Sequence, residues 1–414
     1  MNDNQQAVYI IGGYQTDFAR NFAREGKDIA HIMQESAAGV LQACALLPGQ
    51  IESIHIGNAF GELFNQQSHL GAMLATLDER FWGIPAARHE AACASGSIAI
   101  LAAMAEIEAG RYDCVLVLGA EQERNVGGAQ AAAHMGIAAW TGHEGQDCQY
   151  MWPGLFAQIA DQYQHRYGLH YPHLAAIAEN NLNNAKRNPL AQTRSWQYQA
   201  ASFAQDDEHN PVVAGSLRRQ DCAQVSDGGA AVVLASRRFA EQWAAHHGRT
   251  LAQLPRIAGW GHATACLPLQ PKFARSDEYV FPHLRSAFAA ALKRAGLNEV
   301  FQLQGLEVHD CFSISQYLAI DHCGITPAGQ SWRAIESGEL AFGGTLPLNP
   351  GGGLIGGGHP VGATGVRMLW DAARQVQGSA GDFQVEAARN FATLNLGGSV
   401  GTVVSFVVQS GECA

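Results

Sequence analysis

Short apolar runs alternate with longer alanine-rich segments along most of the chain. Apolar runs bounded by glycine or polar residues predict buried strands at residues 8–13, 54–57, 114–119, 229–234, 306–308 and 402–408. Helical patterns lie between them, at residues 95–109 and 365–375. Strands that alternate with helices are typical of layered α/β proteins, so we expect that fold class.

The segment from about residue 125 to residue 220 has a different character. Trp, Tyr, His, Asn and Gln are frequent there, and helical patterns cover residues 154–167 and 174–187. Prolines interrupt the pattern at Pro153, Pro172, Pro189 and Pro211. We interpret this segment as an insertion that covers a site, stabilises a dimer, or does both.

The plan of strand, glycine-rich turn, long helix and strand occurs on both sides of the insertion. A duplicated α/β fold is the economical explanation, although the two halves share little sequence. We therefore predict a first half made of residues 1–124 and 221–245, a loop domain at residues 125–220, and a second half at residues 246–414.

Composition and charge narrow the function classes. The chain has 414 residues, is 47% hydrophobic and carries a formal net charge of −11. An acidic chain without a block of Lys and Arg is not typical of nucleic-acid binders, although a few local cations can still hold a phosphate-bearing substrate. No run of about 18 apolar residues predicts a membrane span. The polar first residues do not resemble a signal peptide, and the last three are no peroxisomal address, so we expect a cytoplasmic protein.

Nine cysteines are scattered along the chain without a CxxC pair. That pattern favours a reducing compartment over a disulfide framework. Cys413 is expected to be a tail residue without a chemical role. Four others are expected to be small, buried apolar residues: Cys44, Cys114, Cys222 and Cys266.

Cys93 differs from these because small residues surround it, in the sequence Ala91-Ala92-Cys93-Ala94-Ser95, directly before a predicted helix. A helix N-terminus favours a thiolate, and small neighbours let a substrate approach closely. The position therefore suits a nucleophile. A cysteine buried in a tight packing turn has the same local pattern, and spacing alone favours neither interpretation.

Glycines crowd residues 351–365 around one histidine, His359, at the start of a helical pattern. A GxGxxG match lies within this block, but Pro347 and Pro350 stand where a dinucleotide-binding motif needs a strand, and no GK[ST] follows. So much glycine is conformationally costly unless the turn uses it. His359 is therefore a candidate base.

Two further segments carry candidate chemistry. His309 and Cys311 directly follow the predicted strand at residues 306–308, so both can face one cavity. Metal binding with His322 and Cys323 is the rival interpretation, but the spacing matches no familiar zinc pattern and we expect no metal. Gly397 precedes the last strand, where its backbone N–H serves either an oxyanion or an ordinary turn.

Together these segments resemble the thiolase family, and the resemblance spans nearly the whole chain. Residues 358–365 resemble the family's GHPxGxSG block, Cys93 resembles its acyl-accepting cysteine, and residues 226–231 resemble its SDGAAA segment. Two departures occur together. The chain has HDCF at residues 309–312 where most thiolases have NEAF, and NLG at residues 395–397 where most have CxG. This combination is similar to the sterol-carrier-protein-2 type of thiolase.

The resemblance implies a thiolase fold, with duplicated layered αβαβα halves and an inserted loop domain. It implies an acyl-CoA C-acyltransferase of lipid metabolism that condenses acyl-CoA or cleaves 3-ketoacyl-CoA. Coenzyme A would be substrate or product, and no further cofactor is expected. The resemblance also implies a homodimer or homotetramer and allows a small partner protein with an OB-fold and zinc ribbon.

The roles of four residues follow from the resemblance. Cys93 would accept the acyl group, and His359 would take its proton. Cys311 would act as acid and base on the second thioester, and His309 would stabilise its enolate. This assignment is chemically coherent, because a Claisen step needs a base separate from the nucleophile and donors for the enolate.

The resemblance also assigns binding roles. The backbone N–H groups of Cys93 and Gly397 would form the other oxyanion hole, and Ser226 would help bind coenzyme A. Ala223 stands where many thiolases have a serine that contacts coenzyme A. Side chains of the insertion are expected to shape the acyl pocket unless they are core residues: Met151, Trp152, Phe156 and Tyr163.

Three alternatives remain open. A β-ketoacyl synthase uses a cysteine and two histidines with an acyl carrier protein, but residues 358–365 and Cys311 favour a thiolase. A related steroid-type retro-aldolase lacks the nucleophilic cysteine that this chain has at residue 93. A CoA-ester-binding subunit of a larger complex would not need the intact set of Cys93, Cys311 and His359.

Overall fold

The computed structural model describes residues 7–411. Its strands have these bounds: β1 Val8–Gln15, β2 Ser53–Gly57, β3 Ala86–His89, β4 Cys114–Gln122, β5 Val212–Ala214, β6 Leu217–Arg218, β7 Asp227–Ser236, β8 Arg256–Thr264, β9 Gly305–Val308, β10 Asn390–Gly397 and β11 Thr402–Gln409. Nine of them form one mixed sheet in the order β3-β2-β4-β7-β1-β8-β11-β10-β9. Strands β5 and β6 form a separate ribbon.

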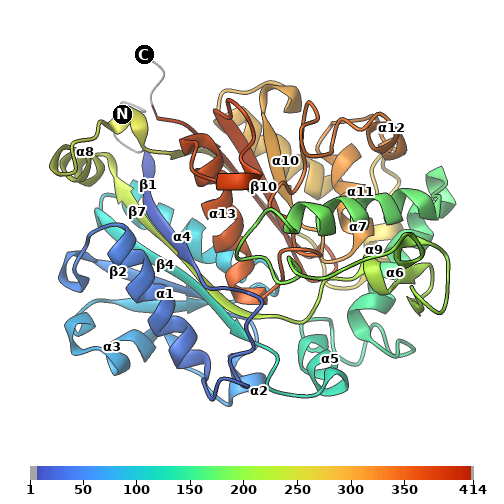
Figure 1. The fold of residues 1–414 in the computed structure, drawn as a ribbon, viewed down its shortest axis with the longest axis horizontal. Helices are drawn as coiled ribbons and strands as arrows, with labels where there is room; N and C mark the ends of the chain where they lie inside the picture. The colour runs from blue at the N-terminus through green and yellow to red at the C-terminus, as the bar shows by residue number, and fades with distance from the viewer. Residues whose placement is uncertain (1–6, 412–414) are drawn as a thin grey trace.

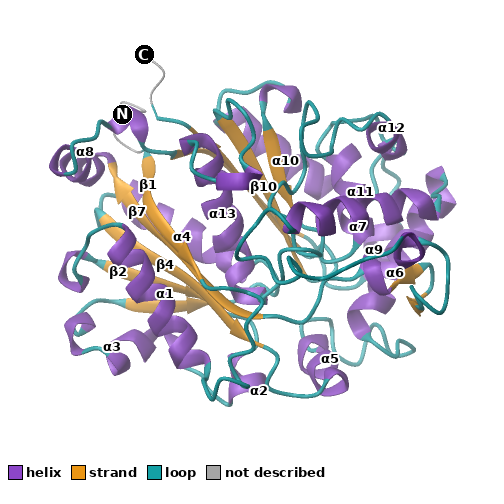
Figure 2. Cartoon of the chain, viewed as in Figure 1, coloured by secondary structure: helices purple, strands orange, loops and turns teal. Residues whose placement is uncertain are grey.

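Helices cover the outer side of each end of this sheet, and further helices lie between its two ends. Their bounds are α1 Ile29–Ala43, α2 Gly61–Asn65, α3 Met73–Leu77, α4 Ser95–Glu108, α5 Gly128–Gly136, α6 Met151–Tyr167, α7 Tyr171–Ala185, α8 Arg237–His246, α9 Leu269–Phe273, α10 Pro282–Arg294, α11 Ser313–His322, α12 Ser331–Glu336 and α13 Val361–Gln377. The strands form two groups, β3-β2-β4-β7-β1 and β8-β11-β10-β9. Helices α1 and α8 pack on β1 and β7 of the first group, and α10 packs on β8 and β11 of the second. Helix α13 contacts strands of both groups and packs against α4 (Figures 1 and 2). The predicted layered α/β fold class is therefore confirmed.

The two groups of strands meet only along a short seam. Strands β1 and β8 pair through Val8 with Ile257 and Tyr9 with Arg256. Beyond that seam the groups diverge, and α13 lies between them in Figure 1. The middle of the fold is thus a helical layer enclosed by two sheet halves.

Glycines make the close approach of this layer possible. A Cβ atom added at Gly119 in β4 would lie 2.2 Å from the carbonyl oxygen of Gly362, and one added at Gly96 in α4 would lie 2.7 Å from it. No side chain fits at such distances, so each position needs glycine. Gly96 lies three residues after Cys93, and Gly362 lies three residues after His359. The close contact between these glycines therefore brings the two candidate residues together.

The predicted elements are present, with differences at their ends. Helix α6 begins at Met151 and α7 begins at Tyr171, three residues before the predicted starts. Pro153 and Pro172 lie in the first turns of these helices, where a missing N–H breaks no helical hydrogen bond. They begin the helices rather than interrupt them. The domain boundaries at residues 124, 220 and 245 stay predictions.

The cysteines divide by environment. Cys44 and Cys114 are fully buried, as predicted. Cys266 is exposed and Cys222 is half-buried, so the prediction was wrong for these two. Cys266 lies in the loop after β8, where nothing covers it, and Cys413 lies outside the described residues. No helix within residues 7–411 combines the length and the apolar character that crossing a membrane would require.

Candidate active site

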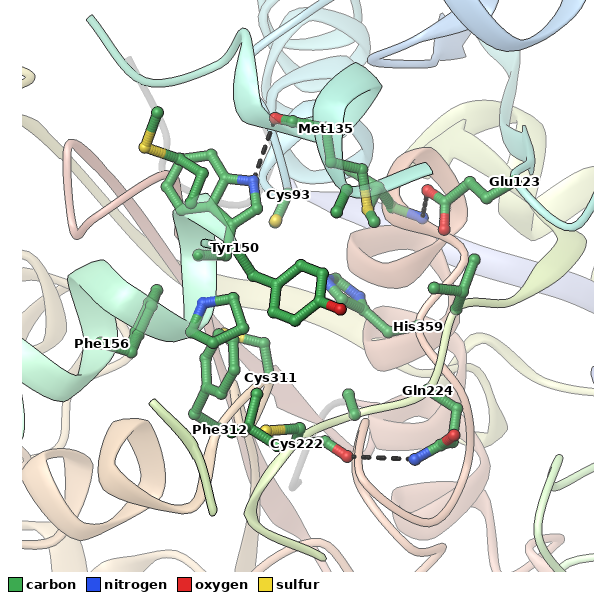
Figure 3. A pocket seen from close by; sticks show the side chains of 18 of the residues that line it. Cys93, Glu123, Met135, Tyr150, Phe156, Cys222, Gln224, Cys311, Phe312 and His359 are labelled. Carbon is green, nitrogen blue, oxygen red and sulfur yellow. Dashed lines mark hydrogen bonds between the residues drawn. The ribbon is translucent and has the colours of Figure 1, made fainter. Parts of the chain in front are cut away.

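A cavity of about 300 Å³ is lined by residues from both halves of the fold and from the segment between residues 125 and 225. Its wall includes Cys93, Cys311 and His359, which Figure 3 shows around the same space. Met151, Trp152 and Phe156 of the insertion also line it, as predicted. Tyr163 does not, because it is fully buried and its hydroxyl donates to Asp321 at 2.8 Å.

Cys93 lies in the turn that leads into α4. The preceding residue, Ala92, has a φ of 50°, in the left-handed region. Burial, and then the nearby Glu123 carboxyl, raise the pKa of the Cys93 thiol to about 12, although the backbone N–H of Gly398 opposes this by hydrogen-bonding the sulfur. Desolvation therefore outweighs the helix dipole, which favours a thiolate, and the resting group of this ligand-free site is a thiol.

His359 is held as a neutral base. Its Nδ1 lies 2.7 Å from the Thr364 hydroxyl, which itself donates to the Pro360 carbonyl at 2.9 Å. Thr364 must therefore accept from Nδ1–H, which leaves the lone pair on Nε2. That Nε2 is buried and has no hydrogen-bond partner among the described residues. Burial, and then Arg367, lower the pKa of His359 to about 3, so the ring is neutral.

His309 has the opposite tautomer. The Asn395 amide nitrogen donates to His309 Nδ1 at 3.0 Å, so the proton of the neutral ring is on Nε2. The Ser97 hydroxyl donates to the Asn395 side-chain oxygen at 2.8 Å, so both ends of this amide have a hydrogen-bond partner. Burial, and then His359, hold the pKa of His309 well below its usual value. His309 can therefore donate a hydrogen bond where His359 can accept one.

The three groups lie close together. The Cys93 sulfur and one ring nitrogen of each histidine are all within 4.8 Å of one another. The rings of His309 and His359 meet edge to face, with centroids 5.3 Å apart. Since each Nδ1 is engaged with Thr364 or Asn395, Nε2 is the nitrogen that each ring presents to the thiol.

Cys311 lies just before α11 and is 8% exposed. Its sulfur contacts the Ser315 hydroxyl at 3.6 Å. Burial, and then the nearby Cys93, hold the pKa of Cys311 well above its usual value, so the resting group is a thiol. A thiol in this place can give a proton to a carbanion or to a leaving sulfur.

Within residues 7–411, His322 and Cys323 do not join His309 and Cys311 in a cluster, as the rival metal interpretation would require. Cys93, His309 and His359 form the one group within residues 7–411 whose ligand atoms are spaced as around a metal ion. His322 lies elsewhere in the core, where its Nδ1 contacts Asp321, and Cys323 is buried beside it. The absence of a metal stays a prediction.

Ser226 lies behind His359 rather than on the cavity wall. It is fully buried, accepts from the backbone N–H of His359 at 2.8 Å, and donates to the Gln192 side chain. The geometry does not support a direct contact between Ser226 and coenzyme A. The residue instead positions the backbone of His359.

The backbone N–H that reaches the Cys93 sulfur belongs to Gly398, one residue beyond the predicted Gly397. Gly398 lines the cavity and bonds the Cys93 sulfur, whereas Gly397 is the last residue of β10. A Cβ atom at Gly397 would lie 2.3 Å from the Ala91 carbonyl oxygen. Gly397 is therefore needed for close packing against the turn that carries Cys93, and Gly398 presents the N–H.

Two buried or half-buried side chains, Lys272 and His283, bind the turn that follows β10 at residues 398–401. Lys272 is 3% exposed and donates to the carbonyl and hydroxyl of Ser399 and to the Leu267 carbonyl. His283 donates to the Val400 carbonyl at 2.8 Å. These bonds fix the turn that carries the Gly398 N–H.

Two family models match the chain. "Thiolase, N-terminal domain" matches residues 8–238, and "Thiolase C-terminal domain-like" matches residues 270–410. The chain belongs to the thiolase family. The acetyl-CoA acetyltransferase of Methanothermobacter thermautotrophicus is 30% identical to this thiolase over 95% of this chain and 97% of that protein. Sterol carrier protein 2 of Gallus gallus is 26% identical over 95% of this chain and 70% of that protein.

Solved structures share the fold. The structure of the "Ltp2-ChsH2(DUF35) aldolase" has a TM-score of 0.78 and 20% identity, and the match covers 99% of this chain and 100% of that one. At that identity the likeness shows the fold alone. The structure of human mitochondrial 3-ketoacyl-CoA thiolase matches with a TM-score of 0.66 and 17% identity over 99% of each chain. With the family model over residues 8–238, these likenesses confirm the predicted thiolase fold.

Sequence reasoning missed three residues of this thiolase site. Thr364 and Asn395 lie inside segments that carried the resemblance, but their contacts with the histidines exist only in the folded chain. Glu123 lines the cavity and follows the last residue of β4. Its signal was a charged residue directly after an apolar strand, where side chains of α/β folds often reach a site.

Proposed function

We propose that this thiolase is an acyl-CoA C-acyltransferase that cleaves or forms 3-ketoacyl-CoA through an acyl-Cys93 intermediate. The observation that carries the proposal is the pair of neutral histidines with opposite tautomers beside one thiol. His359 offers a lone pair and His309 offers an N–H, as a base and an enolate donor must. The relative named acetyl-CoA acetyltransferase supports the same class.

The first step in the cleavage direction is attack by Cys93. His359 Nε2 takes the thiol proton, and the sulfur attacks the 3-keto carbon of the substrate. The N–H groups of Cys93 and Gly398 stabilise the resulting oxyanion. Donors of this kind are each worth about 3–4 kcal/mol of barrier.

Collapse of this intermediate breaks the carbon–carbon bond. It leaves an acyl group on Cys93 and the enolate of a shortened thioester, whose oxygen accepts from His309 Nε2–H. The Cys311 thiol then protonates the enolate carbon and becomes a thiolate.

Release restores every group. The Cys311 thiolate takes the proton of an incoming CoA thiol, and the CoA sulfur attacks the acyl-Cys93 carbonyl. Cys93 leaves as a thiolate and regains its proton from His359. Condensation is the same sequence in reverse.

Acylation by acetyl-CoA tests the proposal. We expect the intact mass of the wild type to rise by one acetyl group and Cys93→Ala to show no increase. Absence of an adduct on the wild type, or the same adduct on Cys93→Ala, would refute the acyltransferase. The same result would favour a CoA-ester-binding subunit. A preference for acyl carrier protein over coenzyme A, with decarboxylation of a malonyl donor, would favour a β-ketoacyl synthase.

We also propose that this thiolase works in the cytoplasm, in lipid metabolism, as a homodimer or homotetramer. Strand β3 supports association, because it is an edge strand with Ala86 and Ala87 exposed. A small partner protein is part of the same proposal, because the name "Ltp2-ChsH2(DUF35) aldolase" joins two components in a solved neighbour of this fold. Light scattering of the purified chain alone tests the homodimer or homotetramer. The same measurement on the protein isolated from its native source tests for the added mass of a small partner.

A further inference from the structure

Three carboxyl groups are buried where β4 ends, and they differ in how they are satisfied. Glu121 accepts four hydrogen bonds at 2.8–3.0 Å, from one side-chain amide and three backbone N–H groups. Asp227 accepts three backbone N–H groups at 2.8–3.0 Å. Glu123 has weaker partners, the Val361 N–H at 3.3 Å and the Ser226 N–H. Glu121 and Asp227 thus hold the backbone together, whereas Glu123 has hydrogen-bonding capacity to spare.

Glu123 also differs in what it faces. It is 1% exposed, and its side chain lies on the cavity wall, as Figure 3 shows. It is the one acid among the described residues that line the cavity. Beside it, Phe60, Val361 and Val225 join Cys93 in one apolar cluster. An acyl group on Cys93 would therefore meet a largely apolar wall in which Glu123 is the one carboxyl group among the described residues.

The surroundings favour the neutral form of this carboxyl group. Burial, and then the charges of Glu121 and Asp227, hold the pKa of Glu123 well above its usual value. A neutral carboxylic acid can donate through its O–H and accept through its carbonyl oxygen. An alkyl chain offers it no partner and excludes the water that could serve instead, which leaves a buried polar group unsatisfied.

We propose that Glu123 selects acyl thioesters that carry an oxygen substituent on the acyl chain, by hydrogen-bonding that oxygen while the acyl group is on Cys93. The proposal rests on the acyltransferase function above and names its substrate class. Glu123 would thus distinguish oxygenated acyl groups from plain fatty acyl groups of equal length. Glu123 acts on specificity, and the chemistry of acyl transfer stays with Cys93 and the histidines.

Matched thioesters test the proposal. Butyryl-CoA, 3-hydroxybutyryl-CoA and 4-hydroxybutyryl-CoA differ only in the presence and place of a hydroxyl group. Each would transfer its acyl group to the Cys93 sulfur and release CoA–SH, so intact mass against time gives the rate. For the wild type we expect at least one hydroxyacyl thioester to react about tenfold faster than butyryl-CoA, since sites built to hydrogen-bond a substrate reject the analogue that lacks the group.

Two variants separate the hydrogen bond from the shape of the residue. Glu123→Leu should bring the rate ratio to about one, mainly because butyryl transfer becomes faster. Glu123→Gln keeps the size and one set of donors, so it should retain part of the preference. Equal rates for all three thioesters on the wild type, or an unchanged preference in Glu123→Leu, would overturn the proposal. If Glu123→Leu does not fold, the wild-type ratio and Glu123→Gln still decide.

The outcomes also separate this inference from the proposed function. No adduct from any of the three thioesters would overturn the acyltransferase and the role of Glu123 with it. Adducts that form on Cys93 at equal rates would overturn only the role of Glu123.

Discussion

Replacing Thr364 by valine tests whether the tautomer of His359 makes it a base. The Thr364 hydroxyl accepts from His359 Nδ1–H at 2.7 Å and thereby keeps the Nε2 lone pair toward Cys93. Valine has nearly the same shape, and the site is fully buried, so packing is retained. The Pro360 carbonyl keeps two backbone donors at 3.0 Å, from Ala363 and residue 364. His359 Nδ1–H is then the group that loses its partner.

The size of the effect follows from that one lost partner. A buried donor without an acceptor costs about 1–3 kcal/mol. The ring can avoid this cost by moving its proton to Nε2 or by rotating, and either change removes the base from Cys93. We therefore expect acylation of Cys93 by acetyl-CoA to slow roughly 5- to 150-fold. The free energy of unfolding should fall by about 1–3 kcal/mol at most.

Rapid quenching followed by intact-mass analysis gives the acylation rate of the wild type, Thr364→Val and Thr364→Ser. Serine keeps the hydroxyl, so Thr364→Ser should stay within about threefold of the wild type, because it loses only a buried methyl group. The reasoning fails if a folded Thr364→Val acylates at the wild-type rate. It also fails if Thr364→Ser slows as much as Thr364→Val, since the lost methyl group would then be the cause.

Three further predictions address the other groups. Cys311→Ala should acylate at Cys93 normally but lose about 100-fold or more in thiolysis of acetoacetyl-CoA, and full thiolysis would exclude its role as an acid. Asn395→Leu frees His309 Nδ1 to take the proton, so the carbon–carbon step should slow about 10- to 100-fold while acylation is retained. Equal slowing of both steps would contradict the assigned tautomer. Because the pKa of Cys93 is about 12, its alkylation by iodoacetamide without substrate should rise about tenfold per pH unit from about pH 7 to about pH 10. A plateau near neutral pH, measured by peptide mapping, would show a preformed thiolate.

Local patterns in the sequence predicted those features that local forces decide. Apolar runs predicted the strands because a buried strand needs apolar side chains on both faces. The glycines around His359 indicated a functional turn, and the structure shows the physical need, which is the contact between Gly119 and the Gly362 carbonyl. Small residues near Cys93 indicated close packing for the same reason. The residues that meet at this crossing were therefore accessible to sequence reasoning.

Features that depend on distant contacts were not accessible. The tautomer of His309 depends on Asn395, which is 86 positions away in the chain. The place of Ser226 depends on the backbone of His359, which is 133 positions away. The shift of the donor from Gly397 to Gly398 depends on where β10 ends, and sequence patterns locate such ends only to within a few residues. The resting state of Cys93 depends on burial by the covering insertion, which no pattern around the cysteine can report.

Cys93 and His359 rest as a neutral thiol and a neutral imidazole, and this has a consequence for activation. With the pKa of Cys93 at about 12 and that of His359 at about 3, transfer of the proton from sulfur to nitrogen is strongly unfavourable in the ligand-free protein. The thiolate therefore becomes accessible only when a thioester carbonyl can receive the charge and the donors at Cys93 and Gly398 can stabilise it. Preorganised donors cost no reorganisation at that moment, because Lys272 already holds the turn that carries one of them. Activation of the nucleophile is thus coupled to occupation of the site, and until then the half-buried thiol has little thiolate character to react with oxidants.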